Sequence, residues 1–489
     1  MRKRKLYKLL AILDPKSLDL LREFLSTSFF NTNPTLVVFF DAWRKHILGS
    51  NYDPEMTAEG FLKRTGIQPA RMDKLSTLLS QKVMEFLAMV EFRESDRLQK
   101  ELFMKGLLKR EMPISDLEWQ YGRITNRVKK EPVSSERLLH QLRLRRILAE
   151  ATVHNRQTRV VWQEDFGELH EMLDAYYELE KLKLTSASLN AWYIFNHGKE
   201  TEDAIPRVLR MDPATRAELA PLPRAYALIV ALLESEGSAS DLLTELLALL
   251  DAHASDFSEL EANQVYAYVL NFSIREMNKG RHEFREPTAA LYRQLLDNGM
   301  LHHEGTIPPQ QFKNIVALHC RIGELDYVEG LIQRVDDLLS PEFTPQAVAY
   351  NHAVLSFHQQ DYASAILDLK EVISDLRDDV FYGIDARVYL WRSYFENLPN
   401  ASLDEVDEMY RLYDSFRIYL DRNDKISQAH KTAYRSFIRL FKRMIDLYPD
   451  LFEDRSALES LKVELEETHQ LPNRGWFLAK IDSALAALG

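Results

Sequence analysis

Three groups of residues in this chain have types and spacing that could bind a metal ion or supply a nucleophile. His170 and Asp174 are four residues apart, which suits two metal ligands on one helix face and equally an ordinary ion pair. His302-His303-Glu304 precedes a proline-containing turn, and Cys320 is the only cysteine. The neighbouring His319 points to a different side of a helix from Cys320. We interpret the three groups as an ion pair, a solvated turn and a core thiol.

Common motifs of catalysis and of phosphate binding are missing from the sequence. It has no Gly-x-x-x-x-Gly-Lys loop, no Gly-x-Gly-x-x-Gly, no Gly-x-Ser-x-Gly and no His-Glu-x-x-His. A single cysteine excludes an intrachain disulfide and a thiolate metal cluster. We therefore expect no catalytic residue, no metal site and no cofactor, and a protein that is not an enzyme.

The elements that must position any site are predicted to be helices. Only 16 Gly and 18 Pro occur among 489 residues, while 46% of the residues are hydrophobic and 28% are charged. Typical chains contain roughly 7% Gly, so this chain has few turn formers for its length. Stretches that alternate apolar and polar residues are missing as well. These features predict an all-α fold with a sizeable core.

Several helix boundaries can be predicted from capping residues and apolar stripes. Asp14-Pro15 and Asn33-Pro34 each place a capping side chain before a proline that suits the first helical position. Ser115-Asp116-Leu117-Glu118 fits a capping box. Further helices are expected at 69–92, 134–152, 456–471 and 476–488. In the C-terminal part, Glu464 and its acidic neighbours are expected to form a polar outer face.

A short segment of the chain matches a second segment further along. Asp326-Tyr327-Val328-Glu329-Gly330-Leu331 aligns with Asp361-Tyr362-Ala363-Ser364-Ala365-Ile366 at an offset of 35 residues. A helical stripe precedes each segment and another follows it. Repetition at this period predicts a row of paired helices.

On these residues the chain resembles the tetratricopeptide repeats, most closely from Ala349-Tyr350-Asn351 to Ala365-Ile366. The resemblance implies a right-handed solenoid of helical hairpins, which must stack to bury their apolar faces. Its signature residues are Tyr327, Gly330, Ala353, Tyr362 and Ala365, the small ones lying where two helices approach closely. Gln359-Gln360-Asp361 departs from the usual turn. Over its whole length the chain resembles bacterial helical-repeat proteins without an assigned activity.

Breaks in the helical pattern divide the chain into four regions. We expect a basic helical module at 1–92, a connecting region at 93–222, tetratricopeptide-like pairs at 223–445 and capping helices at 446–489. The longest apolar run, 225–233, is about half of the ~18 residues that a membrane span requires. We therefore expect a cytoplasmic protein without a membrane partner.

Charge is distributed unevenly between the two ends of the chain. Residues 1–146 contain 28 Lys and Arg against 18 Asp and Glu, a net charge of +10, whereas the remainder carries −22. The basic part either binds an anionic partner or docks against the acidic remainder. Residues 57–79 resemble a helix-turn-helix, with Gly66 at the turn and Leu62 where that motif usually has alanine.

Two functions remain open on this basis. The first is a non-catalytic helical-repeat scaffold that binds a protein or peptide partner on a concave surface. The alternative is a regulator that binds nucleic acid through residues 57–79 and uses the repeats as a sensor.

Overall fold

The computed structural model describes the chain as a succession of helices. The residues described are 5–48, 68–154, 162–195, 212–235, 239–278, 280–302, 305–341, 344–375, 380–424, 426, 428–447, 454–468 and 471–488. Throughout these ranges the chain forms helices and no strand, apart from one isolated bridge between Val133 and Phe257. The all-α class is therefore confirmed. None of the helices described is long and apolar enough to cross a membrane.

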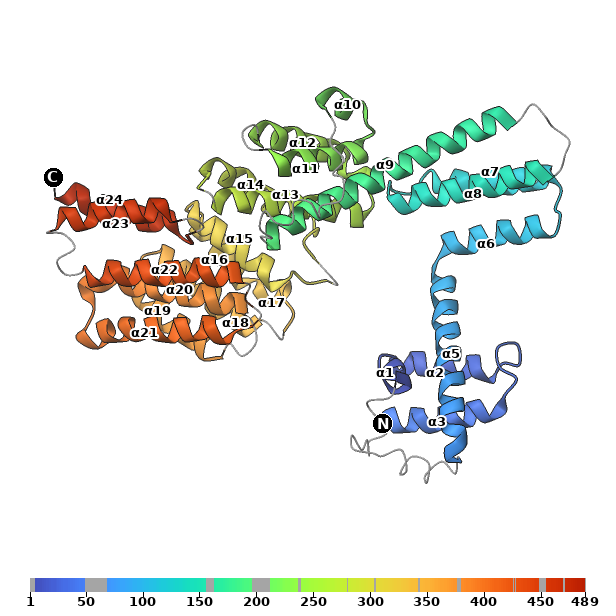
Figure 1. Ribbon diagram of the computed structural model, residues 1–489, viewed down its shortest axis with the longest axis horizontal. Coiled ribbons are helices and arrows are strands. Elements are labelled where there is room, and N and C mark those ends of the chain that lie inside the picture. The colour runs from blue at the N-terminus through green and yellow to red at the C-terminus, as the bar shows by residue number, and fades with distance from the viewer. Residues whose placement is uncertain are drawn as a thin grey trace. The chain divides into compact units, whose positions relative to one another are not determined.

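Figure 1 shows the helices under the labels used from here on. Those before residue 200 are α1 (Lys5–Ala11), α2 (Pro15–Ser26), α3 (Pro34–Leu48), α5 (Pro69–Glu94), α6 (Asp96–Lys109), α7 (Ile114–Val128), α8 (Ser135–His154) and α9 (Trp162–Phe195). Those up to residue 321 are α10 (Pro213–Glu218), α11 (Pro221–Glu234), α12 (Ala239–His253), α13 (Glu259–Asn278), α14 (Arg285–Asp297) and α15 (Pro309–Arg321). The remainder are α16 (Leu325–Gln333), α17 (Val335–Leu338), α18 (Thr344–His358), α19 (Tyr362–Asp375), α20 (Val380–Glu396), α21 (Leu403–Arg422), α22 (Gln428–Asp446), α23 (Arg455–Glu467) and α24 (Arg474–Ala487).

The chain divides into two compact units, and the division falls inside α9. One unit holds residues 1–131 and 136–173, and the other holds residues 132–135 and 174–489. In the first unit one hydrophobic cluster joins α1, α2, α3 and α5, and another joins α6, α7 and α8. The first cluster lies within the region 1–92 that the sequence suggested as a module.

The predicted helix starts in the first cluster are confirmed. The Asp14 carboxylate accepts a hydrogen bond from the Ser17 backbone N–H at 2.6 Å, and α2 begins at Pro15. Asn33 accepts from the N–H of Thr35 at 3.1 Å, next to the start of α3. A side-chain acceptor satisfies one of the backbone donors left free at a helix start.

The predicted capping box at 115–118 is wrong. Helix α7 already begins at Ile114, after Pro113, and no side chain caps it. A proline precedes the expected motif, and the helix begins two residues earlier than a cap at Ser115 would place it. A capping box is present instead at the start of α21, where Ser402 and Glu405 cap each other's backbone N–H groups.

In the second unit, α11 packs against α12 and α13, and from α13 to α24 each helix packs against the next one. Helix α18 lies against α15, α16, α19 and α20, and α20 lies against α21. The pair α15–α16 and the pair α18–α19 therefore share a common interface. Glu464 of α23 pairs with Arg439 and Arg443 of α22, and its neighbours Glu466 and Glu467 are exposed, so this face of α23 is polar as expected.

These two pairs correspond at an offset of 37 residues, not 35. Their turns contain Gly323 and Gln360, both at positive φ (85° and 66°). In each turn the next N–H bonds a carbonyl five residues earlier, from Glu324 at 3.0 Å and from Asp361 at 2.9 Å. This is the Schellman arrangement that ends many helices. The offset inferred from the sequence is two residues too short, because the alignment matched the Asp-Tyr dipeptides. In the structure it is the turns that correspond.

A buried carboxylate joins three helices of the second unit to residues 132–135. Glu261 of α13 is fully buried and accepts from Lys183 of α9 at 2.8 Å and from Tyr226 of α11 at 2.6 Å. The Ser135 backbone N–H donates to it at 3.2 Å. Burial and the Glu261 charge raise the pKa of Tyr226. A buried charge is tolerated when it is paired and hydrogen-bonded in this way.

The position of the turn between α15 and α16 predicts that alanine substitution has opposite effects on stability at two glycines that are seven residues apart. Gly323→Ala should lower stability by about 1 kcal/mol, because a side chain is strained at positive φ. Gly330→Ala should raise stability by about 0.5–1 kcal/mol, because a Cβ built there meets nothing within 4 Å and α16 gains helix propensity. Urea midpoints followed by circular dichroism measure both. Equal effects of the two substitutions on the urea midpoint would contradict the placement of the turn at Gly323.

Candidate functional site

The repeat-signature residues fall in two unlike settings. Ala353 and Ala365 are fully buried where α18 packs against α19, and Tyr362 begins α19 with its ring 5.5 Å from that of Phe357. Gly330 differs from Ala365, because a Cβ there would enter open space. The close approach that we expected to require a small side chain at 330 is therefore not found.

Tyr327 lies inside the first turn of α16 and not at its start. Its ring is 4.6 Å from the ring of His319 in α15, and the Arg293 guanidinium lies 5.2 Å from its centroid. At the offset of 37 residues the counterpart of Tyr362 is Leu325. The two tyrosines therefore have similar neighbours in sequence and different roles in packing.

The two histidine groups show no metal geometry in the part of the chain described. His170 and Asp174 are both exposed on α9. The His302 ring nitrogen contacts the Gly299 carbonyl at 3.1 Å, and His303 and Glu304 lie outside the described residues. Among the described residues, three or more His, Cys, Asp or Glu side chains do not gather anywhere as a metal ion would require.

Cys320 and His319 are both buried in α15. Burial raises the pKa of the Cys320 thiol to about 12, and only 3% of the side chain is exposed. Burial also lowers the pKa of His319. The hydrogen bond of 2.5 Å between its Nδ1 and Glu324 acts in the opposite direction and is the weaker effect. The imidazole is thus paired within the turn between α15 and α16. This pairing gives His319 a structural role in that turn.

The helix-turn-helix suggestion at 57–79 can be followed only in its second half. Residues 57–67, including Leu62 and Gly66, lie outside the described residues. Residues 69–79 form the first turns of α5, where Met72, Leu75 and Leu79 are buried in the first hydrophobic cluster. Arg71 and Lys74 are exposed.

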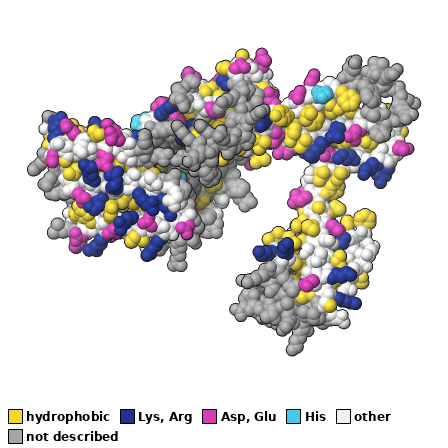
Figure 2. All heavy atoms as spheres, viewed as in Figure 1, with side chains coloured by type: hydrophobic (Ala, Val, Ile, Leu, Met, Phe, Trp, Pro, Cys, Tyr) yellow, Lys and Arg dark blue, Asp and Glu magenta, His cyan; other side chains and the backbone are white. Residues whose placement is uncertain are grey.

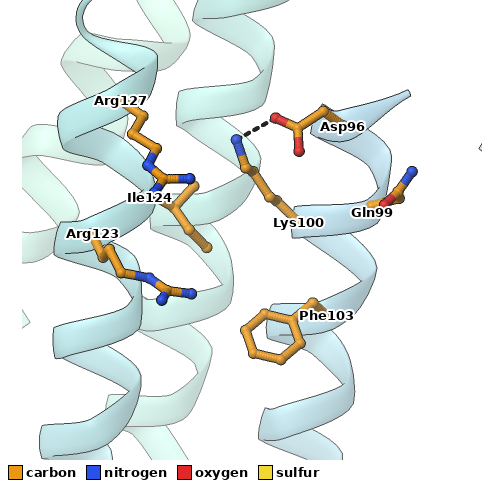
Figure 3. Close-up of a pocket in the computed structure, with 7 residues that line it drawn as sticks. All are labelled: Asp96, Gln99, Lys100, Phe103, Arg123, Ile124 and Arg127. Carbon is orange, nitrogen blue, oxygen red and sulfur yellow. Dashed lines mark hydrogen bonds and ion pairs between the residues drawn. The ribbon is translucent and has the colours of Figure 1, made fainter. Parts of the chain in front are cut away.

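A hollow between α6 and α7 in the first unit brings cationic and aromatic side chains together. Its volume is about 160 Å³. Figure 3 shows Arg123 and Arg127 extending from α7, and Lys100 and Phe103 extending from α6. The remaining lining residues are Asp96, Gln99 and Ile124. Figure 2 also shows Lys and Arg side chains beside hydrophobic ones on the part formed by α7 and α8.

The local sequence explains how the two helices face each other. Helix α6 begins after Ser95, whose hydroxyl accepts the Leu98 N–H at 3.2 Å. It ends in a Schellman turn at Glu111, where φ is 55°. Only four residues separate α6 from α7, so α7 turns back along α6. Ile124 packs into the cluster below the hollow and is 3% exposed.

Ion pairs to neighbouring segments hold both walls in place. The buried Glu101 of α6 contacts the His140 ring nitrogen of α8 at 2.9 Å. Arg97, at the start of α6, pairs with Glu131 at 2.7 Å just beyond the end of α7. The side chains that line the hollow therefore project from a supported pair of helices.

The charges in the hollow do not balance. Lys100 pairs with Asp96 one turn earlier on α6. In the described residues Arg123 and Arg127 have no carboxylate partner, and Arg123 lies over the Trp119 ring at 5.3 Å from the centroid. Trp119 is 62% exposed and Phe103 is 45% exposed. Two unneutralised cations beside exposed aromatic rings can bind an anionic group together with an apolar one.

Sequence reasoning missed this hollow, although the residues on the α7 side could have been recognised from their spacing. Trp119, Arg123 and Arg127 recur every four residues and so share one face of a helix. The facing residues Lys100 and Phe103 belong to another helix, and only the turn at Glu111 sets their register.

Comparison of the chain with protein-family models, with curated proteins and with solved structures finds no match.

The burial of Cys320 predicts a thiol that reagents cannot reach in the folded protein. At pH 8 a pKa of about 12 leaves roughly one thiol in ten thousand ionised. Ellman's reagent should therefore label the native chain very slowly and one thiol per chain in 6 M guanidinium chloride. Rapid labelling of the native protein would contradict the structural role of Cys320.

Proposed function

We propose that this chain is a non-catalytic helical-repeat protein that binds a protein or peptide partner. The observation that carries the proposal is the hollow between α6 and α7. At about 160 Å³ it is smaller than the roughly 300–1,000 Å³ of sites that enclose small molecules. A hollow of this size suits one side chain of a larger partner.

The composition of its rim also supports a macromolecular partner. Trp and Arg are the residues that most often dominate the binding energy of protein interfaces. Here Arg123 and Arg127 of α7 line the hollow with Phe103 of α6, and the Arg123 guanidinium also lies over the Trp119 ring, one turn earlier on α7. An exposed tryptophan beside arginines is costly to leave in water and favourable to cover.

The second unit supports the same proposal through its packing. We infer that residues 223–445 stack as tetratricopeptide-like pairs, because α15–α16 and α18–α19 share their turn geometry at an offset of 37 residues. Stacked pairs form long surfaces suited to extended partners. Two of the residues singled out for chemistry in this unit, His319 and Cys320, are buried and support its packing.

Nucleic-acid binding through residues 57–79 is the second candidate. Arg71 and Lys74 are exposed on α5, as cations that contact phosphates must be. The net charge of +10 over residues 1–146 favours the same class of partner. Such binding weakens steeply as salt is raised.

Affinity capture with the full chain in its native host separates the two functions. We expect a protein to co-purify at 0.15 M salt, and Trp119→Ala with Arg123→Ala to reduce its yield about tenfold, because two interface anchors are lost. Lys105→Glu with Lys109→Glu, exposed on another face of α6, is the control and should leave the yield unchanged. Capture of no protein above background, with duplex DNA binding that persists at 0.15 M salt, would favour the second candidate.

A further inference from the structure

We propose that the hollow between α6 and α7 binds an acidic segment of the partner, which presents two carboxylates to Arg123 and Arg127 and one apolar side chain to Phe103. This inference rests on the proposed function and adds the chemistry of the partner. Its occupant is a peptide segment with acidic residues one helical turn apart.

The net charge of the hollow determines the sign and the number of the charged groups that the partner must present. Asp96 already pairs with Lys100, so these two charges cancel. Arg123 and Arg127 have no carboxylate partner among the residues described. A guanidinium binds a carboxylate through paired hydrogen bonds, which a single exposed lysine cannot reproduce. Two carboxylates would therefore neutralise the hollow.

The spacing of the two arginines selects the spacing of the acids. Arg123 and Arg127 are four residues apart on one helix, which corresponds to about 6 Å along its axis. Acidic residues at i and i+4 of a partner helix have the same separation. Between the two arginines the hollow opens toward Phe103 and Ile124, which would contact an apolar side chain placed between the two acids (Figure 3).

One feature favours a peptide over a nucleic acid at this position. Trp119, the ring most exposed there, has Arg123 over its ring, so its use as a platform for a stacked base is restricted. A carboxylate that reaches Arg123 leaves that contact in place.

Fluorescence anisotropy with the full chain tests the inference. The probe is a fluorescein-labelled helical peptide of sixteen residues with one leucine between glutamates at i and i+4, and the matched peptide has glutamines in their place. We expect the glutamate peptide to bind and the glutamine peptide to bind at least about tenfold more weakly. Arg123→Glu with Arg127→Glu should abolish binding of the glutamate peptide and gain binding of a peptide with lysines at the two positions. Lys105→Glu with Lys109→Glu, which changes the net charge equally, should leave binding unchanged.

Several outcomes would overturn the inference. Equal binding of the glutamate and glutamine peptides would do so, as would equal loss in the two charge-reversed variants. Stronger binding of a sixteen-nucleotide oligothymidylate than of the glutamate peptide, lost in the Arg123 and Arg127 variant, would assign the hollow to nucleic acid. If the captured partner protein still binds that variant, the chain binds a protein at a surface other than the hollow, and the acidic-segment inference fails.

Discussion

A pair of amphipathic helices cannot bury both of its apolar faces alone, and this constraint governs the C-terminal half of the chain. Tyr350 of α18 is 1% exposed because Tyr389 of α20 covers it, with ring centroids 6.3 Å apart. Trp391 of α20 in turn stacks on Phe441 of α22 at 4.4 Å. Phe441 stacks on Trp476 of α24 at 5.6 Å. Each of these helices thus packs on the second helix after it along the chain, as helices of stacked pairs do.

The same constraint explains where charged side chains are placed. In the interior of the second unit they are paired or enclosed, as Arg392 is between the rings of Phe357 and Trp476 at 4.5 and 5.2 Å. At the hollow of the first unit, Arg123 lies over the exposed Trp119 ring, and neither Arg123 nor Arg127 has a carboxylate partner among the described residues. Side chains that stabilise a fold are satisfied within it, whereas side chains that bind a partner remain incompletely satisfied until the partner is present.

Local signals predicted the helices well and predicted the arrangement between helices poorly. The starts at Pro15 and Pro34 followed from a capping residue before proline, which is a short-range effect. The offset of 37 residues was missed because backbone φ at Gly323 and Gln360 sets it, and glutamine is not a usual residue for positive φ. The hollow was missed because its two walls are distant in sequence. Only the i, i+4 row from Trp119 to Arg127 could have indicated it.

The most direct test of the account is photocrosslinking in the native host with p-benzoylphenylalanine in place of Phe103. We expect a discrete adduct with one protein, attached to an acidic peptide of that protein and lost when Arg123 and Arg127 are both replaced by glutamate. Leu367, which is 69% exposed on α19, provides the control position and should give no such adduct. Adducts that contain only nucleic acid, or the same protein adduct from both positions, would contradict it.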